Sequence, residues 1–357
     1  MRTICSLLLV LLAAPVFAFD QAALDKHLDT MAQAKRGDAA SWKAARGKVV
    51  EMGSVAIPAL ETAAAEANWT TDGWRRALAA EVCRLRIAKP ELATEVEKPR
   101  GIDPAEYRKF RHGKPSCHRD FAHRGKEIVP LLLEALEYLA GDYTFSAGEA
   151  GAAEKQTLMV ALMQAPGEAL DARAQFAMQG GLLNAEYADD LRAFAAVSFG
   201  QCAGRTALAT LAEVIDGQHP IAVREGAALA LGWAPDKAAL DAIKARLTGE
   251  QSDARITRAL ECALGNLGGA WAWQSRGEDK AAFAKEIRKG CAELLVAELK
   301  ARPENQDVIC TALCMVAWKE SLEALKAIAA DANATQAQKE AANKTLPLLE
   351  MAVAREK

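Results

Sequence analysis

Apolar and polar positions along this chain of 357 residues follow a helical rather than a strand pattern. Leu208 and Leu211, and again Leu240 and Ile243, are apolar positions three residues apart, which places each pair on one face of a helix. Val, Ile, Thr and Tyr nowhere alternate with polar residues over the length of a strand. The sequence therefore predicts an all-α protein.

One pattern recurs along the middle of the chain. Residues 192–211 and 224–243 each contain an arginine, a run of small residues, a glycine eight positions after the arginine, and a second apolar helix. Residues 257–265 repeat the first half of this pattern. The glycines are Gly200, Gly232 and Gly265. Their separations of 32 and 33 residues are typical of helix–turn–helix units stacked along an axis, and we expect each glycine to end its helix in the left-handed conformation.

Weaker copies of the pattern cover about residues 39–67, 125–180 and 305–355, and in the last of these Cys314 stands where the earlier copies have glycine. We therefore expect residues 19–357 to form one α-solenoid of stacked antiparallel helix pairs joined by short turns. Two segments rich in glycine and proline or in tryptophan interrupt the pattern, and we expect them to be irregular insertions. They lie at about 99–125 and 268–279.

The succession of arginine, Ala-Ala, Leu-Gly and a Leu-x-x-Leu helix resembles HEAT-like repeats, especially those of the short phycobilisome-lyase type, most clearly over residues 185–265. The resemblance implies a right-handed solenoid whose second helices line a concave, protein-binding face, and it implies nothing about activity. Arg192 and Arg224 occupy equivalent positions in this pattern. We expect them to form a structural ladder with acidic residues of neighbouring repeats.

The first 18 residues have the features of a secretory signal peptide. Arg2 precedes an apolar run over residues 4–16, and Ala18 follows at a position suited to signal peptidase. The run is too short to span a bilayer comfortably. We therefore expect cleavage after Ala18 and an exported protein, periplasmic or secreted, that is not inserted in a membrane after cleavage.

Composition narrows the range of partners and of cross-links. The chain has 44 Lys and Arg against 47 Asp and Glu, too even a balance for nucleic acid as the main partner. Eight cysteines become seven when Cys5 is removed, and an odd, scattered set is not a disulfide framework. Cys310 and Cys314 lie one helical turn apart, which favours packing over a mutual disulfide. We expect this pair, Cys202 and Cys262 to be buried and unpaired.

Candidate binding chemistry concentrates in the insertion at 99–125, which is basic and holds three of the five histidines beside one cysteine. The candidate ligand-binding residues are Arg108, Arg111, His112, Cys117, His118, Arg119 and His123. Imidazole and thiolate are the usual ligands of zinc and related metals, but the spacing matches no standard zinc pattern. Cys117-His118 also forms part of a c-type haem motif, although Lys114 stands where a second cysteine would be. A solvated basic loop is the interpretation we favour, and a metal or haem site and an anion-binding patch are the alternatives.

Trp271 and Trp273 in the second insertion are further candidates, because tryptophan is enriched at binding hot spots, although packing explains them as well. The sequence contains no assignable Ser-His-Asp set, no glycine-rich phosphate loop and no His-x-x-x-His helix. The sequence thus predicts a protein that is not an enzyme and carries no cofactor. Its predicted function is an exported, non-catalytic scaffold that binds a protein partner along the concave face. A metal- or haem-binding protein centred on residues 112–123 is the alternative.

Overall fold

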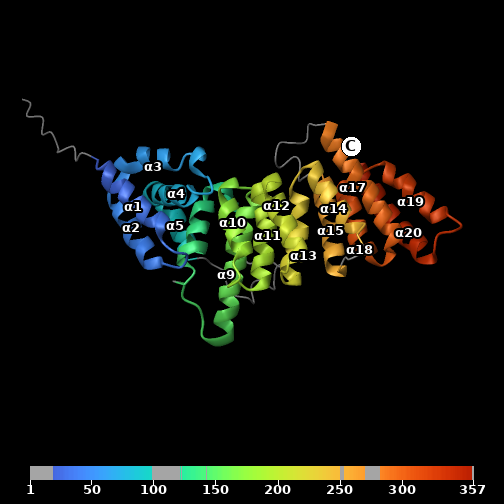
Figure 1. The fold of residues 1–357 in the computed structure, drawn as a ribbon, viewed down its shortest axis with the longest axis horizontal. Helices are drawn as coiled ribbons and strands as arrows, with labels where there is room; N and C mark the ends of the chain where they lie inside the picture. The colour runs from blue at the N-terminus through green and yellow to red at the C-terminus, as the bar shows by residue number, and fades with distance from the viewer. Residues whose placement is uncertain are drawn as a thin grey trace, which may run out of the picture. The chain divides into compact units, whose positions relative to one another are not determined.

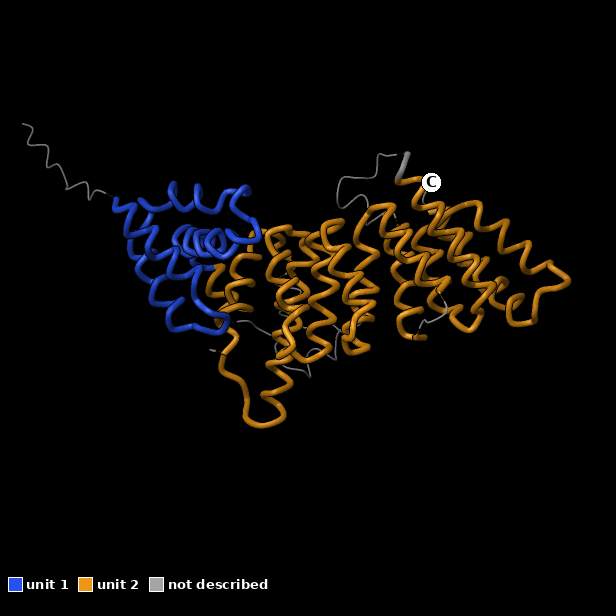
Figure 2. The backbone as a smooth tube through the Cα atoms, in the orientation of Figure 1, with its two compact units in different colours: residues 1–91 blue, residues 92–357 orange. Residues whose placement is uncertain are grey.

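The computed structural model describes residues 19–98, 121, 123–141, 143–249, 253–269 and 282–355. Within these ranges every regular element is a helix, so the predicted all-α, HEAT-like helical repeat fold is confirmed (Figure 1). The chain divides into two compact units, residues 1–91 (unit 1) and 92–357 (unit 2) (Figure 2). The predicted signal peptide, residues 1–18, lies outside the described residues.

Unit 1 contains four α-helices, and two aspartates begin the first two of them. The carboxylate of Asp20 accepts a hydrogen bond from Ala23 N, and that of Asp38 accepts one from Ser41 N, so each satisfies an amide that the helix itself leaves unpaired. Arg76 joins the last helix of the unit to the first through Asp25 and Asp29. The helices are α1 (Gln21–Gln33), α2 (Ala39–Glu51), α3 (Ile57–Ala63) and α4 (Trp74–Ala88).

Unit 2 contains the clearest copies of the repeat. It is preceded by α5 (Pro90–Glu97), which crosses the boundary between the units. The helices that follow are α8 (Val129–Glu134, continued by a π-turn over Ala135–Leu139), α9 (Gly148–Glu168), α10 (Gln175–Leu183), α11 (Asp189–Ala203), α12 (Leu208–Asp216), α13 (Ile221–Ala230), α14 (Lys237–Leu247), α15 (Ala254–Gly268), α17 (Ala282–Ala301), α18 (Gln306–Val316), α19 (Glu320–Ala330) and α20 (Gln336–Arg355).

The helices of unit 2 form two layers. The first layer consists of α9, α11, α13, α15, α18 and α20, each packed against the next. The second layer consists of α10, α12, α14, α17 and α19, which cover the first-layer helices from one side (Figure 1). Since one helix pair cannot bury its apolar stripe alone, the stack itself completes the core.

Glycine lets the backbones of neighbouring first-layer helices touch. A Cβ atom on Gly200 of α11 would lie 2.6 Å from Ala230 O of α13, and one on Gly232 would lie 2.6 Å from Ala263 O of α15. A Cβ on Gly265 of α15 would lie 2.8 Å from the Cα of Ala312 in α18. No side chain fits at these distances, so the 32–33-residue spacing of the glycines records close contact between helices.

The expected role of these glycines as left-handed helix ends is therefore wrong. None of the three has a positive φ. Gly200 and Gly265 lie inside α11 and α15, and Gly232 lies in a 3-10 turn that follows α13. The residue that ends α11 is Gly204, whose φ is +57°. Gly167 at the end of α9, 33 residues before Gly200, belongs to the same series, since its Cβ would lie 2.8 Å from Ser198 Cα.

The repeat arginines bind main-chain oxygens rather than acids of neighbouring repeats. Arg192 Nε donates to Leu182 O at the end of α10 (3.0 Å), and Arg224 Nε donates to Ile215 O at the end of α12 (2.7 Å). Each guanidinium thus meets carbonyls that the preceding second-layer helix leaves unpaired, at the negative end of its dipole. At the end of α14 the carbonyl of Leu247 receives its hydrogen bond from Arg302 instead (3.2 Å).

One carboxyl group is buried in the first layer with an unsatisfied oxygen. Glu261 of α15 is fully buried, and its Oε1 accepts a hydrogen bond from Asn305 Nδ2 (3.0 Å), whereas its Oε2 has no hydrogen-bond partner. Burial raises the pKa of Glu261 to about 7, and the nearby carboxylate of Glu298 acts in the same direction. The folded protein therefore holds this proton more tightly than the unfolded chain does.

We expect Gly232→Ala to destabilise unit 2 by about 1–3 kcal/mol, because the added methyl group forces α13 and α15 apart. Gly180→Ala is the matched control, since Gly180 lies in α10 and a Cβ there meets nothing within 4 Å. That substitution should be neutral or stabilise by up to about 1 kcal/mol, through helix propensity. Urea denaturation of both variants measures the difference, and equal effects would contradict the close-contact role.

We expect Glu261→Gln to stabilise the protein at pH 8 and not at pH 4. Below the pKa of an unfolded glutamate the carboxyl is protonated in both states, so it carries no penalty. As the pH rises toward 7, only the unfolded chain releases the proton, and stability falls by about 2–3 kcal/mol. Glutamine removes this loss, and urea denaturation at the two pH values detects it. The exposed Glu293→Gln serves as control and should shift stability by less than about 0.5 kcal/mol at either pH.

Candidate functional site

Most of the loop residues singled out from the sequence lie outside the described residues. These are Arg108, Arg111, His112, Cys117, His118 and Arg119. His123 is described and is exposed, two positions after the buried Phe121. The next residue, Arg124, forms an ion pair with Glu95 of α5. This end of the loop is thus held against unit 2, and the structure places no second candidate ligand beside His123.

The second insertion begins later than expected. α15 continues through Gly268, so the irregular segment cannot start at that residue. A Cβ on Gly268 would lie 2.7 Å from Val316 Cγ2, which places this residue in the packed layer. Trp271 and Trp273 lie outside the described residues.

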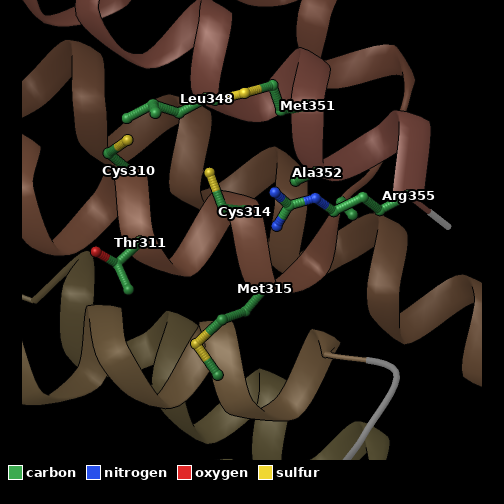
Figure 3. Close-up of a pocket in the computed structure, with 9 residues that line it drawn as sticks. Cys310, Thr311, Cys314, Met315, Leu348, Met351, Ala352 and Arg355 are labelled. Atoms are coloured by element: carbon green, nitrogen blue, oxygen red, sulfur yellow. The ribbon is translucent and has the colours of Figure 1, made fainter.

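A pocket of about 520 Å³ lies between α18 and α20, in the first layer of unit 2 (Figure 3). Both helices contribute side chains to it, at positions spaced by three or four residues, so one face of each helix meets the pocket. Its lining residues are Cys310, Thr311, Cys314, Met315, Ala317, Leu348, Met351, Ala352 and Arg355.

The rim of this pocket is the most apolar exposed surface of the described chain. Met315, Leu348 and Met351 are 43%, 46% and 52% exposed, and all three line the pocket. The other two large hydrophobic side chains exposed among the described residues, Val55 and Leu183, lie elsewhere. Contiguous apolar surface of this kind marks binding sites more often than single exposed side chains do.

One positive charge lies beside the apolar rim. Arg355 lines the pocket from α20, and Figure 3 shows its guanidinium turned toward the side where Cys314 lies. It forms no ion pair with any residue in the described part of the chain. The pocket therefore combines apolar walls with a cation that is available to an outside group.

The floor of the pocket carries two thiols. Cys310 is buried and Cys314 half-buried, and a hydrogen bond joins their side chains. That bond lowers the pKa of Cys310 to about 6, against the effect of burial, and raises the pKa of Cys314. Both are free thiols, as is the half-buried Cys262, while the buried Cys202 places its thiol 3.5 Å from Pro166 O. Cys262 and Cys314 are thus less buried than expected.

A second pocket, of about 490 Å³, lies between α17 and α19 in the second layer. Trp318 and Val296 supply its larger apolar side chains, and Lys289 and Glu293 form an exposed ion pair at its edge (3.6 Å). It lies on the layer that the HEAT resemblance associates with protein binding. Its lining residues contribute none of the large exposed hydrophobic side chains, so it is the weaker candidate.

The sequence indicated one half of the α18–α20 pocket. The spacing of Cys310 and Cys314 showed that they share a helix face, but nothing singled out Leu348, Met351 or Arg355. These three recur at intervals of three and four residues, a spacing that a core-facing stripe would also have. Only the packing of α20 on α18 and α19 decides that they are exposed.

Two searches of the described residues returned nothing. No described helix is both long and apolar enough to cross a membrane. No three His, Cys, Asp or Glu side chains within the described ranges lie in a group suited to a metal ion.

No protein-family model matches the chain, and no curated protein matches it. Eleven chains of solved structures do match. Among them is human deoxyhypusine hydroxylase in complex with glycerol, at 18% sequence identity, with 73% of this chain and 96% of that chain covered and a TM-score of 0.32. A likeness this low transfers no activity or site to the present chain.

The comparison does correct one inference from the sequence. The prediction that the protein is not an enzyme rested on a helical repeat fold without a familiar catalytic motif. The matching hydroxylase is an enzyme by name, so a helical architecture does not by itself exclude catalysis.

Proposed function

We propose that this protein is a helical-repeat scaffold that binds a protein partner at the pocket between α18 and α20. The observation that carries the proposal is the convergence of Met315, Leu348 and Met351 on one pocket. Methionine side chains are flexible and polarisable, and surfaces that bind protein segments use them often. This surface lies on the first layer, not on the second-helix face that the HEAT resemblance implies.

The chemistry of the pocket defines the partner segment. Its apolar side chains would pack against Leu348 and Met351, and one carboxylate would meet the guanidinium of Arg355. An amphipathic helix with an acidic residue beside its apolar stripe satisfies both conditions. The resemblance to the short phycobilisome-lyase type of repeat rests on the repeat residues alone and adds nothing to this choice.

We expect Leu348→Asp to weaken partner binding at least tenfold, because it places a charge in the apolar contact. Leu183→Asp is a matched control, since Leu183 is 48% exposed and lies on α10 away from the pocket. A photo-crosslinking residue at position 348, and separately at 183, would identify the partner in cells of the source organism. Binding constants are then measured with the purified partner.

Arg355→Glu should weaken the same complex, and its effect should shrink as salt is added, because the contact it removes is electrostatic. Equal crosslinking from positions 348 and 183, or unchanged affinity in Leu348→Asp, would show that the pocket does not bind the partner.

We further propose that the protein acts outside the cytoplasm, because residues 1–18 have the pattern of a signal peptide. N-terminal sequencing of the protein isolated from its source should then begin at Phe19. Mature protein that retains Met1 would contradict export by this route.

A further inference from the structure

Sulfur atoms meet in the α18–α20 pocket. The thiols of Cys310 and Cys314 lie one turn apart on α18 and are joined by a hydrogen bond. The thioether of Met351 comes from α20 on the other wall, and Figure 3 shows it turned toward the opening above the two thiols. Met315 also lines the pocket, but its sulfur would lie 3.4 Å from a Cβ on Gly265, on the α15 side of the helix. The cluster therefore consists of two thiols and one thioether.

The lining offers these sulfurs no hard competitor. It contains no His, Asp or Glu side chain. Calcium and magnesium require oxygen ligands, and structural zinc sites take four ligands from cysteine, histidine and carboxylates. Thiolate and thioether sulfur instead favour soft, monovalent d¹⁰ ions such as Cu(I), which accept few ligands.

The charges of the pocket also suit such an ion. Two thiolates and one monovalent cation carry a net charge of −1, and Arg355 supplies the opposite charge from the same lining. The hydrogen bond from Cys314 already lowers the pKa of Cys310, so one thiolate is available near neutral pH. Binding of the ion then releases the one proton that the two sulfurs share.

We propose that Cys310, Cys314 and Met351 form a binding site for one soft monovalent metal ion of the Cu(I) class. The site goes beyond the proposed partner binding and does not depend on it, because the rim residue Leu348 contributes no ligand. It is also distinct from the alternative metal or haem site in residues 112–123.

The test uses the full chain with Ag(I), a redox-stable substitute, and with Cu(I) under anaerobic conditions against a competing chelator. We expect one equivalent per chain and a higher thermal midpoint with metal bound. Cys310→Ser/Cys314→Ser should abolish both effects, and Met351→Leu should weaken binding at least tenfold. Affinity should fall as the pH drops below about 6, because protons compete for Cys310.

Three controls separate this site from others. Cys291→Ala removes a buried thiol outside the pocket and should leave binding unchanged. Cys117→Ser and the pair His118→Ala/His123→Ala test the loop, and they should also bind one equivalent. Leu348→Asp should impair partner binding while leaving the metal stoichiometry intact, so the two proposals succeed or fail separately.

Full Ag(I) and Cu(I) binding by Cys310→Ser/Cys314→Ser, or its loss in the loop variants, would overturn the site. Zn(II) bound through the same residues with equal affinity would overturn the ion class. Met351 is half exposed, so Met351→Leu should fold normally and keeps the test decisive should the double variant be unstable.

Discussion

Backbone contact between successive first-layer helices is the constraint on which unit 2 depends. Gly200, Gly232 and Gly265 meet the backbone of the next helix at alanine positions, where even one methyl group would clash. Short side chains leave little rotamer freedom to lose on folding and allow many close atomic contacts. The alanine-rich composition is therefore a packing requirement as much as a helix preference. Once the first layer is spaced in this way, the ends of the second-layer helices come within reach of Arg192 and Arg224, whose guanidiniums bind their last carbonyls.

The period of the fold was visible in the sequence, but the reason for it was not. A glycine at the end of a run of small residues looks the same whether it ends a helix or admits a neighbouring backbone. The two roles differ in φ and in what lies opposite, and both depend on the next repeat. Gly204 ends α11 four residues beyond the position that the pattern suggested. The partners of the arginines were hidden for a similar reason, because main-chain carbonyls carry no mark in the sequence.

The candidate site shows the same limit at the scale of single residues. Leu348 is 46% exposed while its neighbour Leu349 is fully buried. Both are leucines in a helical run, and only the rotation of α20 against α18 and α19 separates them. Cys310 and Cys314 could be paired from sequence because both lie on one helix. Met351 could not be added to them, since it comes from another helix whose register no local pattern fixes.

The pocket lies where the glycine series stops. At the register position of Gly200, Gly232 and Gly265, α18 carries Cys314, whose side chain lines the pocket instead of admitting a neighbouring backbone. A thiol at this position excludes the contact that joins the earlier helices, so α20 packs on α18 with a space between them. The apolar rim and the sulfur floor then have one origin. A break in the closest packing of the stack exposes side chains that every earlier repeat replaces by touching backbone.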